Sequence, residues 1–165
     1  MSGLGTGEAP ERTEFEGAVY GSLLAASVVA GSAVDDRPLP AGDLVAVLIS
    51  TGVVFWLAHL YAHVISHGPR PLSWRRLWAA GRREWPLAQA AFPPSVAAAL
   101  ASGLGASDAA ASWIAMAVAI ADQVSWSVAA AIRSRAGIGV VLLSGAANLI
   151  LGLAIIALKT LLEAH

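Results

Sequence analysis

Long apolar runs dominate the sequence, and short clusters of Pro, Gly, Asp and Arg separate them. Four runs contain at most one Asp, Glu, Lys or Arg each, and they cover residues 17–34, 44–66, 109–132 and 137–159. A helix of about 20 apolar residues is long enough to cross the hydrocarbon core of a bilayer. The pattern therefore predicts four transmembrane helices from these runs.

A fifth span is predicted at 86–105, which is rich in alanine and carries Pro93 and Pro94 near its middle. Proline removes a backbone donor and bends a helix, so we expect this span to be kinked. The preceding segment, 72–85, holds four arginines and three tryptophans. It is too charged to span and predicts an interfacial helix with tryptophans at headgroup level. The predicted fold is an all-α bundle of five spans.

Composition supports this assignment. Hydrophobic residues make up 57% of the 165 residues, charged residues only 13%, and mean hydropathy is +0.68. Soluble domains usually carry about 25% charged residues. Residues 1–16 are polar and lack the charged and apolar regions of a signal peptide, so we expect a disordered tail there. Residues 17–165 then form one transmembrane domain.

Loop charges predict the orientation. The arginines concentrate in the loops at 67–85 and 133–136, whereas the loops at 35–43 and 105–108 hold one basic residue, Arg37. Cytoplasmic loops carry an excess of Lys and Arg. We therefore expect the N-terminus inside and the C-terminus outside.

Several polar side chains interrupt the apolar spans, and such residues are costly in lipid and often functional. They are His59, His63, Gln89, Asp122, Gln123 and Asn148. At 1.5 Å per residue, His59 and Asp122 differ in depth by only about 4 Å. Each shares its helix side with small residues, which are typical of helix contacts in membranes. We expect an Asp–His site in a common polar interior.

The leading functional hypothesis is a channel or transporter for protons or a small cation. Asp122 would accept the charge, His59 would titrate beside it, and His63 would relay protons toward the cytoplasm. The amides expected to line the pathway are Gln89, Gln123 and Asn148.

Two alternatives remain open. The polar residues of a non-transporting scaffold or regulator would only lock the helices in register. A metal- or haem-binding protein would use the two histidines spaced by four residues, with Asp122 and Glu16 completing a set of His59, His63, Asp122 and Glu16. The chain has no cysteine and no further acid–base grouping, so we expect neither an enzyme nor a cofactor.

Partners follow from the same features. The net charge of −1 provides no basic field for nucleic acid. We expect a lipid bilayer as the surroundings and a proton or small cation as the ligand. An odd number of spans argues against a simple inverted repeat within one chain, and we expect a homo-oligomer, which could supply the symmetry.

The stretches GAVYGSLLAASVVAG, FWLAHLYAH and EWPLAQAAFPP resemble small integral membrane proteins of high-GC Gram-positive bacteria. This resemblance implies a bacterial plasma membrane location and no particular activity. VFWLAHLYAHV and AAFPP are also similar to segments of the bacterial relatives of the lysosomal potassium channel. The Arg…Phe-Ser-Asp signature of that family is replaced by EFEGAVYG, so the resemblance assigns no pore residue.

Overall fold

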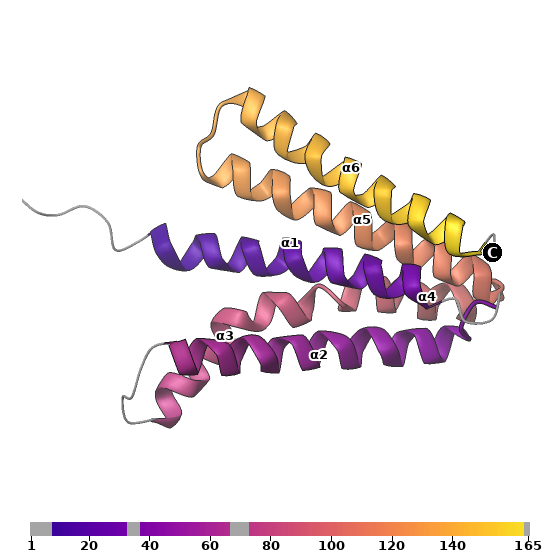
Figure 1. Cartoon of the computed structure of the whole chain (residues 1–165), viewed down its shortest axis with the longest axis horizontal. Helices are drawn as coiled ribbons and strands as arrows, with labels where there is room; N and C mark the ends of the chain where they lie inside the picture. Colours follow the sequence, from indigo (N-terminus) through magenta and orange to yellow (C-terminus); the bar gives the residue numbers. More distant parts are fainter. Residues whose placement is uncertain (1–7, 33–36, 67–72, 164–165) are drawn as a thin grey trace, which may run out of the picture.

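The longest apolar runs of the sequence become the longest helices of the computed structural model (Figure 1). The structure describes residues 8–32, 37–66 and 73–163. The helices in these ranges are α1 (Glu8–Gly31), α2 (Ala41–Ser66), α3 (Trp74–Gln89), α4 (Phe92–Gly103), α5 (Asp108–Arg133) and α6 (Ile138–Glu163). The prediction of an all-α protein is confirmed.

Three of the described helices, α2, α5 and α6, are long and apolar enough to cross a membrane. They correspond to the runs predicted at 44–66, 109–132 and 137–159. The apolar part of α1, Phe15–Gly31, is shorter. These features support the assignment to membrane proteins.

The N-terminal part of α1 differs from the prediction. Residues 8–16 were expected to belong to a disordered tail, yet the helix already begins at Glu8 and continues to Gly31. Residues 1–7 lie outside the described part of the chain. The charged N-terminal turns thus extend the apolar segment of α1 as one helix.

The third predicted span is divided into two helices. α3 combines the expected interfacial segment with Pro86 and ends at Gln89, and α4 begins at Phe92. Pro93 and Pro94 lie in the first turn of α4, where a missing N–H costs nothing. Because these prolines cannot donate to the carbonyls four residues earlier, the helical ladder is interrupted after Gln89. The prolines therefore start a helix instead of bending the middle of one.

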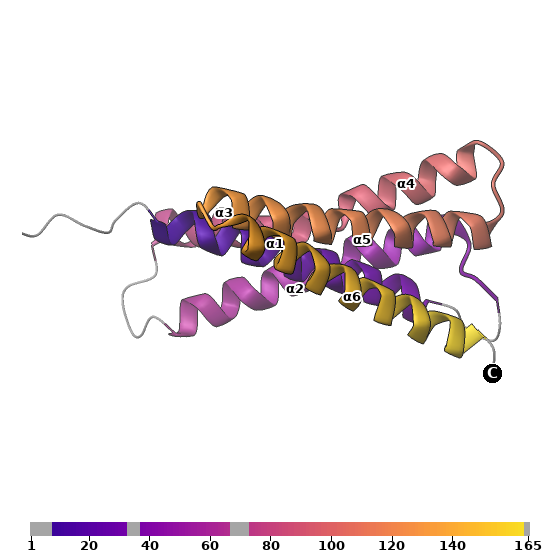
Figure 2. The ribbon, with the colours of Figure 1, turned by 90° about the horizontal axis from the view of Figure 1, so that it is seen from above.

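α1 and α5 lie side by side at the centre of the bundle (Figure 1). α5 packs against α1, α2, α4 and α6, and Figure 2 shows α4 and α6 diverging on opposite sides of it. The main core cluster is built from small residues of α1, Leu44 and Leu48 of α2, Ala98 of α4, and Met116 and its neighbours on α5. The Asp108 carboxylate at the start of α5 accepts a 3.0 Å hydrogen bond from the Ala41 N–H at the start of α2.

Two glycines permit close helix contacts. A Cβ at Gly21 of α1 would lie 2.5 Å from the Leu87 carbonyl oxygen of α3, and a Cβ at Gly52 of α2 would lie 3.0 Å from Ala91 Cβ. Real Cβ atoms do not approach backbone oxygen so closely, so only glycine fits at position 21. These contacts hold α3 and the start of α4 against α1 and α2.

Candidate functional site

A groove with a volume of about 660 Å³ lies between α1, α5 and α6. Its lining is mostly apolar, but polar side chains from each helix contribute. They are Glu16 and Tyr20 of α1, Gln123, Ser127 and Arg133 of α5, and Ser144 and Asn148 of α6. We call this the polar groove. Its volume is within the range of small-molecule sites.

A directional chain of hydrogen bonds joins α5 to α6 at the deep end of the polar groove. Gln123 Nε2 donates to Asn148 Oδ1 at 3.0 Å, and Asn148 Nδ2 donates to the Ser144 carbonyl at 3.0 Å. The second bond orients the Asn148 amide, and the first then orients Gln123. Gln123 is fully buried, and its Oε1 has no hydrogen-bond partner among the described residues. Unpaired buried acceptors are rare, and this enclosed oxygen could accept a hydrogen bond from a ligand in the polar groove once the amide turned toward it.

Charged residues lie at the other end of the polar groove. Glu16 and Arg133 both belong to its lining. The Arg133 guanidinium is 5.3 Å from the centroid of the Phe15 ring, which in turn meets Trp126 edge-on at 5.8 Å. We call the charged end, at Glu16 and Arg133, the mouth of the polar groove. The amide end, at Gln123 and Asn148, is its floor.

Asp122 packs toward α1 beside the polar groove. Its Oδ2 lies 2.9 Å from Ser22 Oγ, and the same hydroxyl is 2.8 Å from the Ala18 carbonyl. Asp122 and Gln123 are consecutive, so adjacent positions on α5 present an acid to α1 and an amide to α6. The sequence prediction missed Ser22, because serine is common in apolar spans and carried no distinguishing spacing.

His59 contacts α1 from the opposite side. Its Nδ1 lies 3.0 Å from the Phe55 carbonyl, and its ring is 5.7 Å from that of Tyr20. Tyr20 and Ser22 are two residues apart, which places them roughly 200° apart around α1. The structure contains no hydrogen bond or ion pair between His59 and Asp122, both of which it describes. The direct Asp–His pair expected from the sequence is thus not formed, because α1 lies between the two side chains.

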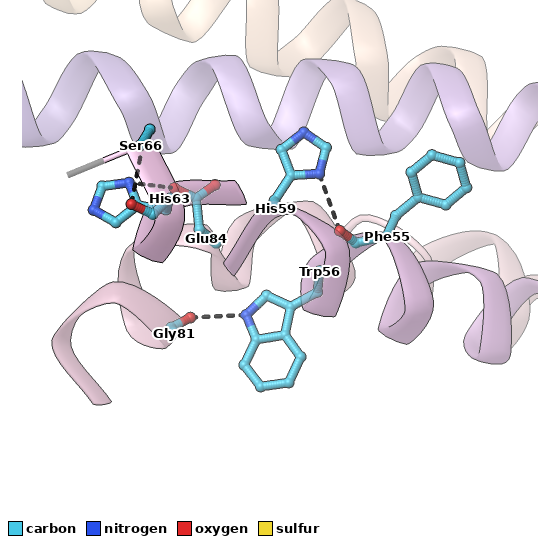
Figure 3. A network of polar contacts seen from close by, with 7 residues as sticks. All are labelled: Phe55, Trp56, His59, His63, Ser66, Gly81 and Glu84. Carbon is cyan, nitrogen blue, oxygen red and sulfur yellow. Dashed lines mark hydrogen bonds and ion pairs between the residues drawn. The ribbon is translucent and has the colours of Figure 1, made fainter. Parts of the chain in front are cut away.

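His63 lies near the end of α2 and meets α3. Its Nδ1 is 3.8 Å from Glu84 Oε1 (Figure 3). About two turns earlier on α2, Trp56 Nε1 donates to the Gly81 carbonyl at 2.8 Å. These two contacts join α2 to α3, so His63 has a partner away from the polar groove.

We expect Glu84→Gln to lower the free energy of unfolding by less than about 1 kcal/mol, because partly exposed ion pairs contribute little. Thermal unfolding in detergent will measure this change. A loss several times larger would mean that the contact between His63 and Glu84 is essential for docking α3.

The remaining predicted site residues do not assemble. Gln89 is exposed at the end of α3 and is not part of the polar groove. Over the ranges that the structure describes, no group of three or more His, Cys, Asp or Glu is placed to hold a metal ion. The alternative metal set of His59, His63, Asp122 and Glu16 is therefore not brought together.

Lys159 is a buried residue that the sequence prediction did not select. It is 1% exposed, and its Nζ lies 3.5 Å from the Val29 carbonyl and 5.5 Å from the centroid of the Trp113 ring. Its position in the apolar run before Leu161 is a signal that could have identified it. It joins the C-terminal part of α6 to α1 and α5.

Comparison of the chain with family models, with curated proteins and with solved structures finds no match. The functional argument therefore depends on the residues and their geometry.

Proposed function

We propose that the protein is a five-span transporter of the bacterial plasma membrane that carries protons or a small cation. The course of the chain supports five spans, because α1, the α3–α4 pair and α6 run in one direction and α2 and α5 in the other (Figure 1). The arginine-rich α3 starts at the end of the bundle where α5 joins α6. Positive charge at that end favours a cytoplasmic location for it, with the N-terminus inside.

The observation that carries the proposal is the polar groove with its buried amide floor. Arg133 at the mouth and Gln123 at the floor are ten residues apart on α5, or about 15 Å along the helix. This is half of a hydrocarbon core about 30 Å thick. Beyond Gln123, the apolar cluster that contains Met116, Ile120 and Val29 fills the interior. A path that reaches the membrane centre and stops there is typical of a carrier open to one side.

The chemistry at the floor favours a ligand that donates hydrogen bonds. Gln123 Oε1 is an unpaired acceptor, and a cation or N–H donor would satisfy it. The Ser22 hydroxyl has one proton but lies near two acceptors, Ala18 O and Asp122 Oδ2. A proton on Asp122 would donate to Ser22 Oγ and complete both bonds. Asp122 is therefore proposed as the proton-carrying group, with Gln123 beside the path.

Flux into proteoliposomes tests this function. An internal pH dye would report proton entry under an imposed potential, and K⁺ and methylammonium would serve as trial cations. We expect wild-type flux to fall at least tenfold in Asp122→Asn and Gln123→Met, since one loses the titrating group and the other the acceptor. Asparagine keeps a donor for Ser22, so the first variant should remain folded.

Gln89→Met is the matched control, because it replaces an exposed amide outside the polar groove and should retain flux. Loss of flux in His59→Ala would instead favour the Asp–His site predicted from the sequence. Absence of wild-type flux for all three ions would contradict the transporter proposal.

The alternative is a scaffold whose polar residues only join helices. The bonds from Gln123 to Asn148 and from Ser22 to Asp122 favour it, because both connect different helices. It predicts that the same variants change stability and that no ion moves. A homo-oligomer also remains a proposal, to be measured by mass determination in detergent.

A further inference from the structure

A second groove, with a volume of about 530 Å³, lies between α2 and α3. We call it the tryptophan groove. Its lining residues are Trp56, Leu60, Trp74, Leu77, Trp78, Gly81, Arg82 and Trp85. Arg82 is the only charged side chain among them, so the surface is apolar with one cationic position.

The inner wall of the tryptophan groove is held in place by specific contacts. Trp56 Nε1 donates to the Gly81 carbonyl at 2.8 Å (Figure 3), and the Trp56 and Trp85 rings meet at right angles with centroids 5.7 Å apart. Trp74 and Trp78 on the outer wall are 76% and 60% exposed. The groove thus combines a fixed wall with two large apolar side chains that nothing in the described chain covers.

Positive charge follows one edge of this groove. Arg75 and Arg82 are seven residues apart, so they project from nearly the same side of α3. That side lies about 50° around the helix from Trp78, which places both guanidinium groups beside the tryptophans. The acidic neighbour, Glu84, faces His63 of α2 instead. Within the ranges that the structure describes, no carboxylate pairs with Arg75 or Arg82, so the positive charge of this edge disfavours a cationic ligand and favours an anionic one.

We propose that the tryptophan groove binds one anionic phospholipid, with an acyl chain against the tryptophans and the phosphate near Arg82 and Arg75. In the topology proposed above, α3 lies at the cytoplasmic interface, where tryptophan rings are favourable and anionic headgroups are available. Arginine recognises phosphate through paired hydrogen bonds. The proposal uses this topology but does not depend on transport.

Tryptophan fluorescence in vesicles provides the test. The protein would be reconstituted into phosphatidylcholine containing a minor fraction of brominated lipid, which quenches tryptophans that it contacts. We expect brominated phosphatidylglycerol to quench more strongly than brominated phosphatidylcholine at the same fraction. An arginine beside the bound headgroup contributes about fivefold to the affinity for anionic lipid, so Arg82→Gln should weaken binding about fivefold and Arg75→Gln/Arg82→Gln about 30-fold.

Arg76→Gln is the matched control, because Arg76 lies about 100° around α3 from Arg75 and should leave the preference unchanged. Trp78→Ala removes an exposed wall residue and should reduce quenching without unfolding the protein. Equal quenching by both brominated lipids in the wild type would overturn the proposal. Equal losses in Arg76→Gln and Arg82→Gln would overturn it too, since they would indicate general attraction to a charged surface.

Discussion

Replacement of Gly21 by alanine will lower the free energy of unfolding by about 1–3 kcal/mol, the usual cost of overpacking a tight interior. The new Cβ would lie 2.5 Å from the Leu87 carbonyl oxygen and 2.8 Å from Ala90 Cβ. The first neighbour is backbone and the second is fixed to it, so neither can rotate away. α1 and α3 would have to separate. Thermal unfolding of the purified protein in detergent measures the effect.

Gly17→Ala is the control for this prediction. Gly17 lies one turn earlier on the same face of α1, yet the nearest atom to its Cβ would be the Leu87 backbone nitrogen at 3.6 Å, an ordinary contact. Alanine also favours a helix over glycine by about 0.5–1 kcal/mol. We therefore expect unchanged or slightly increased stability. Similar losses in both variants would show that α1 and α3 do not pack as described.

The second large effect is expected for Asn148→Leu, which should cost about 1–3 kcal/mol because it leaves a buried donor without its acceptor. Gln123 Nε2 now donates to Asn148 Oδ1, and its other near acceptor is the Asn148 carbonyl at 3.5 Å. Gln123 Oε1 already lacks a partner, so the variant would leave the whole amide poorly satisfied. Unfolding in detergent again measures the loss.

A double-mutant cycle separates this bond from general packing. Gln123→Met/Asn148→Leu removes both polar partners, so the combined cost should be smaller than the sum of the single costs. Couplings of this kind in membrane proteins average about 0.6 kcal/mol and reach about 1.7. Strict additivity would show that the two amides do not interact.

The fold was predictable where one physical effect dominates. α2, α5 and α6 follow from uninterrupted apolar runs, and their ends lie within a few residues of the predicted positions. The break before Phe92 differs from the prediction, which put the kink at Pro93 and Pro94 themselves. Pro93 and Pro94 have no N–H, so the carbonyls of Gln89 and Ala90, four residues earlier, lose their helical hydrogen bonds. A count of backbone hydrogen bonds would have located that break.

The candidate site was predictable only in part. The polar residues Asp122, Gln123 and Asn148 each lie at a contact between helices. Their partners were not predictable, because periodicity gives the side of a helix and not the helix that covers it. His59 and Asp122 both face α1, and only the arrangement of the bundle shows that they face opposite sides of it.

The central position of α5 also bears on biosynthesis. The core faces of α1, α2 and α4 meet on α5, and the first N–H of α2 is capped by Asp108. Chains are synthesised from the N-terminus, so α1, α2 and α4 are made before α5, the helix that covers their core faces. A nascent chain that stops before residue 108 could pack α3 against α1 and α2 but would lack the main core cluster, which needs α5. That cluster should therefore close late in translation, when α5 has been made.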